Sequence, residues 1–405
     1  MKNLLAGLDV GTSKVCALAA EALPDGQLAL LGYGAAPCTG LRKGVVVNIE
    51  ATVEAIRAAI GAAEKTSGVR IGAAAAGMAG PHIRGFNSHG IVAVRGGEVG
   101  AHDVDRVIDA ARAVAIPLDR QVLHTLPQQF AVDEQEGVRE PLGMTGVRLE
   151  ARIHIVTAAK SYGQNLAKCC ERAGVTPAEM VFGPLGSAQA ALFPEERELG
   201  TALIDIGGGA TGIIVFHGGA VMHTAVLPLG GNHLTSDIAA GLRTPLADAE
   251  RLKIAHGIAT TQVVRREETI EAAGVGGREP RVIPRRLLAE IIEPRMEEIF
   301  AMVQRELIRS GVADSLASGL VLVGGTSLLE GAQELAERIF GLPVRRGLPV
   351  NLKGMPEELM KPMYTAAAGL VLHQGAAHGL GNGAGRAGRL GRLRNRLGDL
   401  VRDFF

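Results

Sequence analysis

Two aspartates, each followed by a glycine-rich turn, are the residues of this sequence best suited to chemistry. Asp9 is the last residue but one of the apolar segment LLAGLDV, which precedes Gly-Thr-Ser-Lys, and Asp205 is the last residue but one of ALIDI, which precedes Gly-Gly-Gly-Ala-Thr-Gly. A second apolar stretch follows each turn, VCALAA in the first case and IIVF in the second. Each segment therefore predicts a β-hairpin with an aspartate ending its first strand, and together the two segments are an internal repeat.

Turns of this composition suit the binding of nucleotide phosphates. Glycine lets backbone N–H groups approach phosphate oxygens closely, and Thr or Ser hydroxyls add further donors. Mg²⁺, which accompanies such phosphates, prefers carboxylate and water oxygens, so Asp9 and Asp205 are predicted to hold a hydrated ion in a shared cleft. The predicted phosphate-binding residues are Gly11, Thr12, Ser13 and Lys14 in the first turn and Gly207, Gly208, Gly209 and Thr211 in the second. One such turn alone is equally typical of an ordinary hairpin, and it is the repeat that favours a nucleotide site.

A third glycine turn follows the apolar segment that ends at Val323. It consists of Gly324, Gly325, Thr326 and Ser327. The pattern predicts a buried strand that runs into the start of a helix, where paired glycines would let an adenine or ribose ring lie against the backbone. A routine connection between strand and helix explains this turn equally well on its own.

The end of the chain has a different pattern, with apolar residues at helical spacing. At about 100° per residue they occupy one arc of roughly 140° on a helix. The apolar positions are Leu390, Leu393, Leu397, Leu400, Val401, Phe404 and Phe405, flanked by arginines that include Arg389 and Arg396. Because only one face is apolar and the segment is locally basic, it is predicted to lie in the surface of an anionic bilayer. Docking on the body of the protein or on a partner is the alternative, against which the glycine-rich segment Gly375–Gly388 argues as a flexible linker.

Length and composition limit the class of protein that positions these residues. The chain has 405 residues, more than one hydrophobic core usually holds, so at least two domains are expected. Lys+Arg and Asp+Glu both number 42, and aromatic residues make up 3%, which argues against nucleic-acid binding. Four irregularly spaced cysteines, the lack of a signal-peptide pattern and the lack of a long apolar run predict a cytoplasmic protein without a membrane span.

Periodicity and breaks in the chain predict the elements between these motifs. The expected helices are 53–63, 103–115 (capped by Asp103), 246–255 and 287–307 (kinked at Pro294), and the expected strands are 121–132, 147–157 and 319–325. Gly80-Pro81 is a break where an inserted subdomain could begin.

The two hairpins, the third glycine turn and the intervening helix resemble the actin/Hsp70/sugar-kinase superfamily, and within it the FtsA family of bacterial cell-division proteins. The stretch His124–Ala151 (HTLPQQFAVDEQEGVREPLGMTGVRLEA) is similar to the subdomain inserted in that family, and Gly230–Pro245, Asp248–Gly257, Val275–Arg281 and Glu290–Phe300 are also similar. The resemblance implies an α/β, actin-like two-domain ATPase fold with subdomains IA, IC, IIA and IIB and a C-terminal amphipathic helix. The implied bounds are 1–80, 164–198 and 346–374 for IA, 81–163 for IC, 199–232 and 311–345 for IIA, 233–310 for IIB, 375–388 for the linker and 389–405 for the membrane-targeting helix.

The resemblance also implies cofactors and further site residues. ATP and Mg²⁺ are the implied cofactors, with Gly231 and Asn232 at the nucleotide and Glu250 and Lys253 in the adenosine pocket. A surface salt bridge between Glu250 and Lys253 is the commoner explanation of their i, i+3 spacing. Gln189 lies where actin places a glutamine that orients water, yet proteins of this family hydrolyse ATP weakly if at all.

The function implied by the resemblance is that of a polymer-forming membrane adaptor. It would bind itself, anionic lipid, other division proteins and the C-terminal peptide of the tubulin-like protein FtsZ, on the cytoplasmic side of the inner membrane at the division septum. Arg285, Arg286 and Arg295 in subdomain IIB could contact that acidic peptide, although solvated helix charge is the commoner role for such residues. A small-molecule (sugar-type) kinase and a pilus-assembly actin-like protein of the same superfamily are the alternatives.

Overall fold

The computed structural model of the chain describes residues 4–265 and 267–380, and its first domain is built on a five-stranded sheet. The sheet order is β11-β6-β1-β2-β3, in which β1 pairs antiparallel with β2 and parallel with β6. The strands are β1 (Leu4–Val10), β2 (Lys14–Ala22), β3 (Leu28–Pro37), β6 (Ala73–Met78) and β11 (Thr176–Phe182), and a small separate pair consists of β4 (Leu41–Arg42) and β5 (Val45–Val46).

The second domain repeats this topology, as the sequence repeat predicts. Its sheet order is β14-β13-β12-β17-β18, and β12 pairs antiparallel with β13 and parallel with β17. The strands are β12 (Thr201–Ile206), β13 (Thr211–His217), β14 (Ala220–Leu227), β17 (Leu320–Val323) and β18 (Val344–Arg346). The hairpins β1–β2 and β12–β13 therefore occupy equivalent positions in two equivalent sheets.

Helices cover both faces of the first sheet, which explains why its central strands are almost uniformly apolar. Helix α1 (Ile49–Ser67) buries Ile56 against the face that carries Leu8, and helix α10 (Thr365–Ala377) buries Ala367 against the face that carries Leu5. Helix α3 (Lys160–Ala173) packs beside α1. Helix α4 (Gly183–Ala191) contacts strands of both sheets and packs along α10, so it lies between the two domains.

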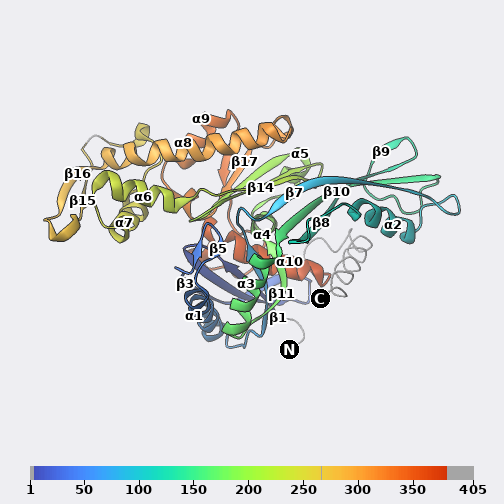
Figure 1. The fold of residues 1–405 in the computed structure, drawn as a ribbon, viewed down its shortest axis with the longest axis horizontal. Coiled ribbons are helices and arrows are strands. Elements are labelled where there is room, and N and C mark those ends of the chain that lie inside the picture. Colours follow the sequence, from blue (N-terminus) through green and yellow to red (C-terminus); the bar gives the residue numbers. More distant parts are fainter. Residues whose placement is uncertain (1–3, 266, 381–405) are drawn as a thin grey trace.

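The inserted subdomain is a four-stranded sheet with one helix on it, and Figure 1 shows it at one end of the long axis of the molecule. Its sheet order is β7-β10-β8-β9, and its elements are β7 (Arg84–Ala93), α2 (Ala101–Arg112), β8 (Arg120–Val132), β9 (Gln135–Val138) and β10 (Arg148–Ala159). Val104, Val107 and Ile108 of α2 pack on Leu149 and Ala151 of β10.

The remaining elements include the hairpin β15–β16, which lies at the opposite end of the molecule from the inserted subdomain (Figure 1). They include a long helix, α8, which buries Ile292 and Phe300 against the second sheet. The elements are α5 (Pro194–Leu199), α6 (Gly231–Leu242), α7 (Leu246–His256), β15 (Thr269–Ala272), β16 (Arg281–Pro284), α8 (Arg285–Arg309) and α9 (Ala332–Phe340), with 3-10 turns at Thr261–Val263, Val275–Gly277, Ala313–Ser315, Gly325–Leu328, Glu357–Leu359 and Pro362–Tyr364. Among the described residues, no helix combines the length and the apolar character that crossing a bilayer requires.

The structure differs from the expected local conformation at several places. Strand β7 was not predicted, because this edge strand has a polar and glycine-rich sequence with little apolar alternation. Asp103 is not the N-cap of α2; it lies inside the first turn, where its Oδ2 accepts the N–H of the actual N-cap, Gly100, at 3.0 Å. Gly375 belongs to α10 and not to a linker. A Cβ at this position would lie 2.6 Å from Leu28 Cδ1, so the glycine allows the helix to pack closely there. Helix α8 also continues through Pro294 as one element.

Candidate functional site

The two predicted hairpins have the same turn. In the first, the Gly11 N–H donates to the Lys14 carbonyl at 3.0 Å, and in the second the Gly207 N–H donates to the Ala210 carbonyl at 3.0 Å. The aspartates also match, because each stands two residues before the first glycine of its turn and pairs with a residue of the following strand. The repeated sequence thus produces a repeated backbone conformation.

The two turns face each other, one from each domain, and we call the region that they border the cleft. A Cβ built on Gly208 would lie 2.0 Å from Ser13 Oγ, and one built on Gly209 would lie 2.6 Å from Thr12 Oγ1. Asn232 joins the turns from the start of α6, because its N–H donates to the Gly208 carbonyl at 2.7 Å and its Oδ1 accepts from Ser13 Oγ at 3.3 Å. These glycines are therefore needed for close approach between the domains.

The cleft offers unpaired hydrogen-bond donors. Within residues 4–265 and 267–380, the backbone N–H groups of Thr12, Ser13, Gly208 and Gly209 make no hydrogen bond. Backbone N–H groups gathered in successive turn residues form a concave anion site, and phosphate oxygens fit such donors. This donor set, contributed by both domains, fits the phosphates of a nucleotide.

Both aspartates lie in the cleft, where desolvation opposes their charge. Burial raises the pKa of Asp9 from 3.8 to about 6, an effect that the Lys14 ammonium opposes and the nearby Asp205 carboxylate strengthens. Burial also raises the pKa of Asp205, opposed by a hydrogen bond from Ser187 and by the Lys14 charge. Two half-buried carboxylates that are costly to ionise without a cation fit the predicted hydrated Mg²⁺.

Asp205 has different surroundings at its two carboxylate oxygens. Ser187 Oγ donates to Oδ2 at 2.9 Å. Oδ1 faces Gly324, which has a φ of +83° and whose added Cβ would lie 2.6 Å from that oxygen. Glycine is required there both for the left-handed backbone and for the space beside the carboxylate.

The third turn and the residues implied for the adenosine pocket lie beside the second hairpin. Thr326 Oγ1 donates to the Gly207 carbonyl at 3.1 Å, and a Cβ on Gly231 would lie 2.5 Å from that hydroxyl and 3.3 Å from Lys253 Nζ. Lys253 Nζ donates to the Gly231 carbonyl at 3.1 Å and to Glu250 Oε2 at 2.7 Å. Lys253 is buried, so this ion pair is not a solvated surface pair and instead borders the cleft.

Several side chains in these motifs have structural roles that the motifs did not predict. The Thr211 hydroxyl donates to the Leu229 carbonyl at 2.9 Å, and the Ser327 hydroxyl donates to the Gly324 carbonyl at 2.8 Å, so the proton of each hydroxyl is committed to a backbone carbonyl. Lys14 Nζ donates to the Met363 carbonyl at 2.7 Å and lies 3.9 Å from the centroid of the Tyr364 ring. Its charge acts on both aspartates, but its ammonium is held at the Met363 segment. Gly325 faces open space, since an added Cβ would meet no atom within 4 Å.

Other predicted residues are not brought to the cleft. Gln189 Nε2 donates to His373 Nδ1 at 3.0 Å, whereas Ser187, another residue of α4, is the one that contacts Asp205. The arginines predicted to contact a partner peptide already have carboxylate partners: Arg285 pairs with Glu268 and Glu330, Arg286 with Glu290, and Arg295 with Asp237 and Glu298. The predicted membrane residues, from Arg389 to Phe405, lie outside the described residues.

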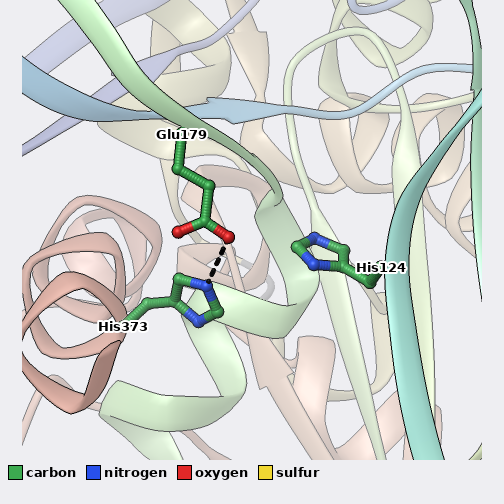
Figure 2. A group of neighbouring side chains, drawn as sticks. All are labelled: His124, Glu179 and His373. Atoms are coloured by element: carbon green, nitrogen blue, oxygen red, sulfur yellow. Dashed lines mark hydrogen bonds and ion pairs between the residues drawn. The ribbon is translucent and has the colours of Figure 1, made fainter. Parts of the chain in front are cut away.

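A second cluster of ionisable side chains consists of His124 of β8, Glu179 of β11 and His373 of α10 (Figure 2). One ligand atom from each lies within 4.8 Å of the others, an arrangement that could hold a metal ion. The hydrogen bonds argue against it. His124 Nε2 accepts the Phe182 N–H at 2.9 Å, so the neutral ring carries its proton on Nδ1.

The hydrogen bonds of His373, the second imidazole of this cluster, also identify the ring nitrogen that carries the proton. His373 Nδ1 accepts from Gln189, which leaves the proton on Nε2, facing Glu179 Oε1 at 3.2 Å. Burial lowers the pKa of His124 to about 3, so that ring stays neutral. The cluster is therefore a hydrogen-bonded joint between the inserted subdomain, β11 and α10. Sequence reasoning missed it because its members are far apart in the chain and share no motif.

Two family models and several curated proteins match this chain. The family model described as "Cell division protein FtsA" matches residues 202–369, and the model "SHS2 domain inserted in FTSA" matches residues 80–157. Over 371 residues the chain is 51% identical to "Cell division protein FtsA" of Pseudomonas aeruginosa, covering 92% of this chain and 89% of that protein. It is 40% identical over 381 residues to the protein of the same description from Escherichia coli strain K12, covering 92% and 90%.

Solved structures with low sequence identity share the fold. The "PilM-PilN type IV pilus biogenesis complex" matches with a TM-score of 0.67 at 18% identity, covering 91% of this chain and 98% of that chain. MreB5 of Spiroplasma citri bound to ADP matches with a TM-score of 0.55 at 15% identity, covering 92% and 96%. The fold is thus the mixed α/β, actin-like fold that the sequence resemblance implied.

Proposed function

Since the chain belongs to the FtsA family of cell division proteins, we propose that it binds Mg·ATP between its two hairpins, polymerises at the membrane and tethers FtsZ there. The observation that carries the proposal is the cleft itself, in which two domains contribute four unpaired N–H donors and two half-buried carboxylates at equivalent positions. The proposed place of action is the cytoplasmic side of the inner membrane at the division septum.

The chemistry of the cleft supports Mg·ATP more than it supports a free anion. The N–H groups of the two glycine turns would bind phosphate oxygens, while Asp9 and Asp205 would bind water molecules of the hydrated ion. Without a cation the two carboxylates would repel the phosphates, so the metal is expected to be part of the ligand. The pair Glu250–Lys253, beside Gly231, would border the nucleoside.

The position of Gln189 supports a protein that binds ATP with little or no hydrolysis. A glutamine that orients the attacking water must reach the terminal phosphate, and the side chain of Gln189 is instead held by His373. Any ATPase activity would therefore be weak, as the resemblance implied. The sugar-kinase alternative requires rapid phosphoryl transfer to a second substrate, so a screen of sugars would separate the two functions.

The FtsZ peptide is proposed to dock on subdomain IIB, near the start of α8. Arg285 is only 17% exposed and bound to two carboxylates, so it cannot easily contact a partner. Arg286 is half-exposed, and Val282, 73% exposed, and Leu287 lie on either side of it in the sequence. A basic side chain beside exposed apolar ones suits an acidic and apolar peptide.

Membrane binding is assigned to the C-terminal amphipathic segment, and the proposal includes avidity. Seven apolar side chains, each half-buried at a bilayer surface, would gain about 1 kcal/mol apiece, and arginines near anionic lipid about the same. Ordering the tail opposes this gain, so one copy is expected to bind weakly and reversibly. A filament presents many tails, and each bound tail raises the effective concentration of the next.

Liposome co-sedimentation tests the proposal directly. The full chain should sediment with vesicles containing anionic lipid, more completely with Mg·ATP than without nucleotide, and a chain ending at Arg386 should remain in the supernatant under both conditions. Equal sedimentation of the two chains would contradict the role of the tail. A polymerisation-deficient variant that binds as tightly as the full chain would contradict avidity while leaving the anchor intact.

A further inference from the structure

The hydrogen bond between Ser187 and Asp205 joins the two domains at the nucleotide cleft. Ser187 belongs to α4, which packs along α10 of the first domain, and Asp205 lies near the end of β12 of the second. Ser187 Oγ lies 2.9 Å from Asp205 Oδ2, and the serine has no exposed surface. None of the motifs that point to the nucleotide site includes this serine.

The Ser187 hydroxyl donates its hydrogen bond outside its own helix. A serine inside a helix commonly donates to the carbonyl four residues earlier, which would satisfy its hydroxyl locally. Ser187 instead donates its single proton to a carboxylate on another domain. A donor that is fully buried and committed to a carboxylate fixes the rotamer of that carboxylate, because breaking the bond would leave both groups unsatisfied in a desolvated site.

Helix α4 is itself held firmly against the first domain. Gly186 and Gly369 bring the backbones of α4 and α10 together, since a Cβ on Gly369 would lie 1.7 Å from the Gly186 carbonyl oxygen. Gln189 donates to His373, which in turn faces Glu179 in the joint of Figure 2. Ser187 is thus presented from a rigidly packed helix.

We propose that Ser187 is a positioning residue for the metal-facing carboxylate of Asp205. Its bond occupies Oδ2 and leaves Oδ1, the oxygen beside Gly324, to hold a water of the hydrated Mg²⁺. This inference rests on the proposed binding of Mg·ATP. The gain in ATP affinity that Mg²⁺ provides would then depend on a contact across the domain boundary, and it would be lost if the domains moved apart.

The test compares ATP affinity with and without Mg²⁺ in the full chain and in Ser187→Ala, using a fluorescent ATP analogue in buffer with Mg²⁺ or with EDTA. Loss of one charge-assisted hydrogen bond that positions the carboxylate should reduce the Mg²⁺-dependent gain in affinity by about tenfold, with little change in EDTA. Ser187→Cys, which nearly keeps the volume but is a weak donor, should show the same direction of change. Ser88→Ala, which removes a hydroxyl bonded to a backbone carbonyl in the inserted subdomain, is the matched control and should behave like the unmodified chain.

A second comparison separates positioning from a general structural role. In an Asp205→Asn background, Ser187→Ala should cause no further loss of the Mg²⁺-dependent gain, because both changes act through the same carboxylate. A full gain retained in both serine variants overturns the inference, as does a further tenfold loss in the Asp205→Asn background. If the unmodified chain binds no ATP with or without Mg²⁺, the proposed function fails, and the inference fails with it.

Discussion

Replacement of Asp9 by asparagine should change how the stability of the nucleotide-free protein depends on pH. Burial raises the pKa of Asp9 from 3.8 to about 6, so the folded protein binds this proton more tightly than the unfolded chain does. A difference of about two pH units corresponds to about 3 kcal/mol in the free energy of unfolding. This is the cost of ionising Asp9 in a cleft that holds no cation.

The raised pKa of Asp9 determines in which direction the stability changes with pH. The contribution of Asp9 to stability is fully present below about pH 4 and is lost as the pH rises through about 6. The amide that replaces the carboxyl group in Asp9→Asn cannot ionise, so the variant should not lose this contribution. At pH 7.5 Asp9→Asn should therefore be more stable than the unmodified protein by up to about 3 kcal/mol, and the advantage should shrink toward pH 4.

Urea unfolding between pH 4 and pH 8 in the presence of EDTA measures this effect as the difference in unfolding free energy between the two proteins. Asp314→Asn, at an exposed site, is the control for the change from carboxyl to amide. Mg·ATP should reverse the advantage at pH 7.5, because the ion stabilises the Asp9 carboxylate and not the amide. A pH-independent difference between Asp9→Asn and the unmodified protein would refute the reasoning that burial governs this carboxylate.

Three further predictions concern the cleft, the partner surface and the tail. Gly208→Val should weaken ATP binding by about 100-fold or more, measured by fluorescence titration, because its side chain would fill the space between the hairpins, whereas Gly72→Val, at a position with no atom within 4 Å of an added Cβ, should not. Arg286→Glu should weaken binding of an FtsZ C-terminal peptide several-fold in fluorescence anisotropy at low salt, and Arg305→Glu, exposed on the same helix, should leave it unchanged. The double replacement Leu397→Glu and Phe404→Glu should abolish sedimentation with anionic liposomes, and retained binding would show that the tail is not the anchor.

The two hairpins, the repeat that relates them and the three glycine turns could all be predicted from the order of residues alone. These features are local, because a glycine-rich turn between two apolar stretches favours a hairpin whatever the rest of the chain does. The repeat also predicted their equivalence, since two similar segments in one chain build similar sheets, and the order of strands in those sheets agrees. The family resemblance supplied the inserted subdomain, and the family model described as "SHS2 domain inserted in FTSA" matches residues 80–157.

Packing between distant segments decided which side chains border the cleft and which make structural contacts elsewhere. Lys253 is buried beside Gly231. The hydroxyls of Thr211 and Ser327 donate to backbone carbonyls, and Gln189 donates to His373. Sequence spacing alone allowed each of these side chains another role. Ser187 reaches Asp205 because α4 packs between the two sheets, a position set by contacts with residues far along the chain. Periodicity and motifs report the conformation of neighbouring residues, whereas the direction of a buried hydroxyl or amide depends on which distant donor or acceptor packing brings within hydrogen-bonding distance.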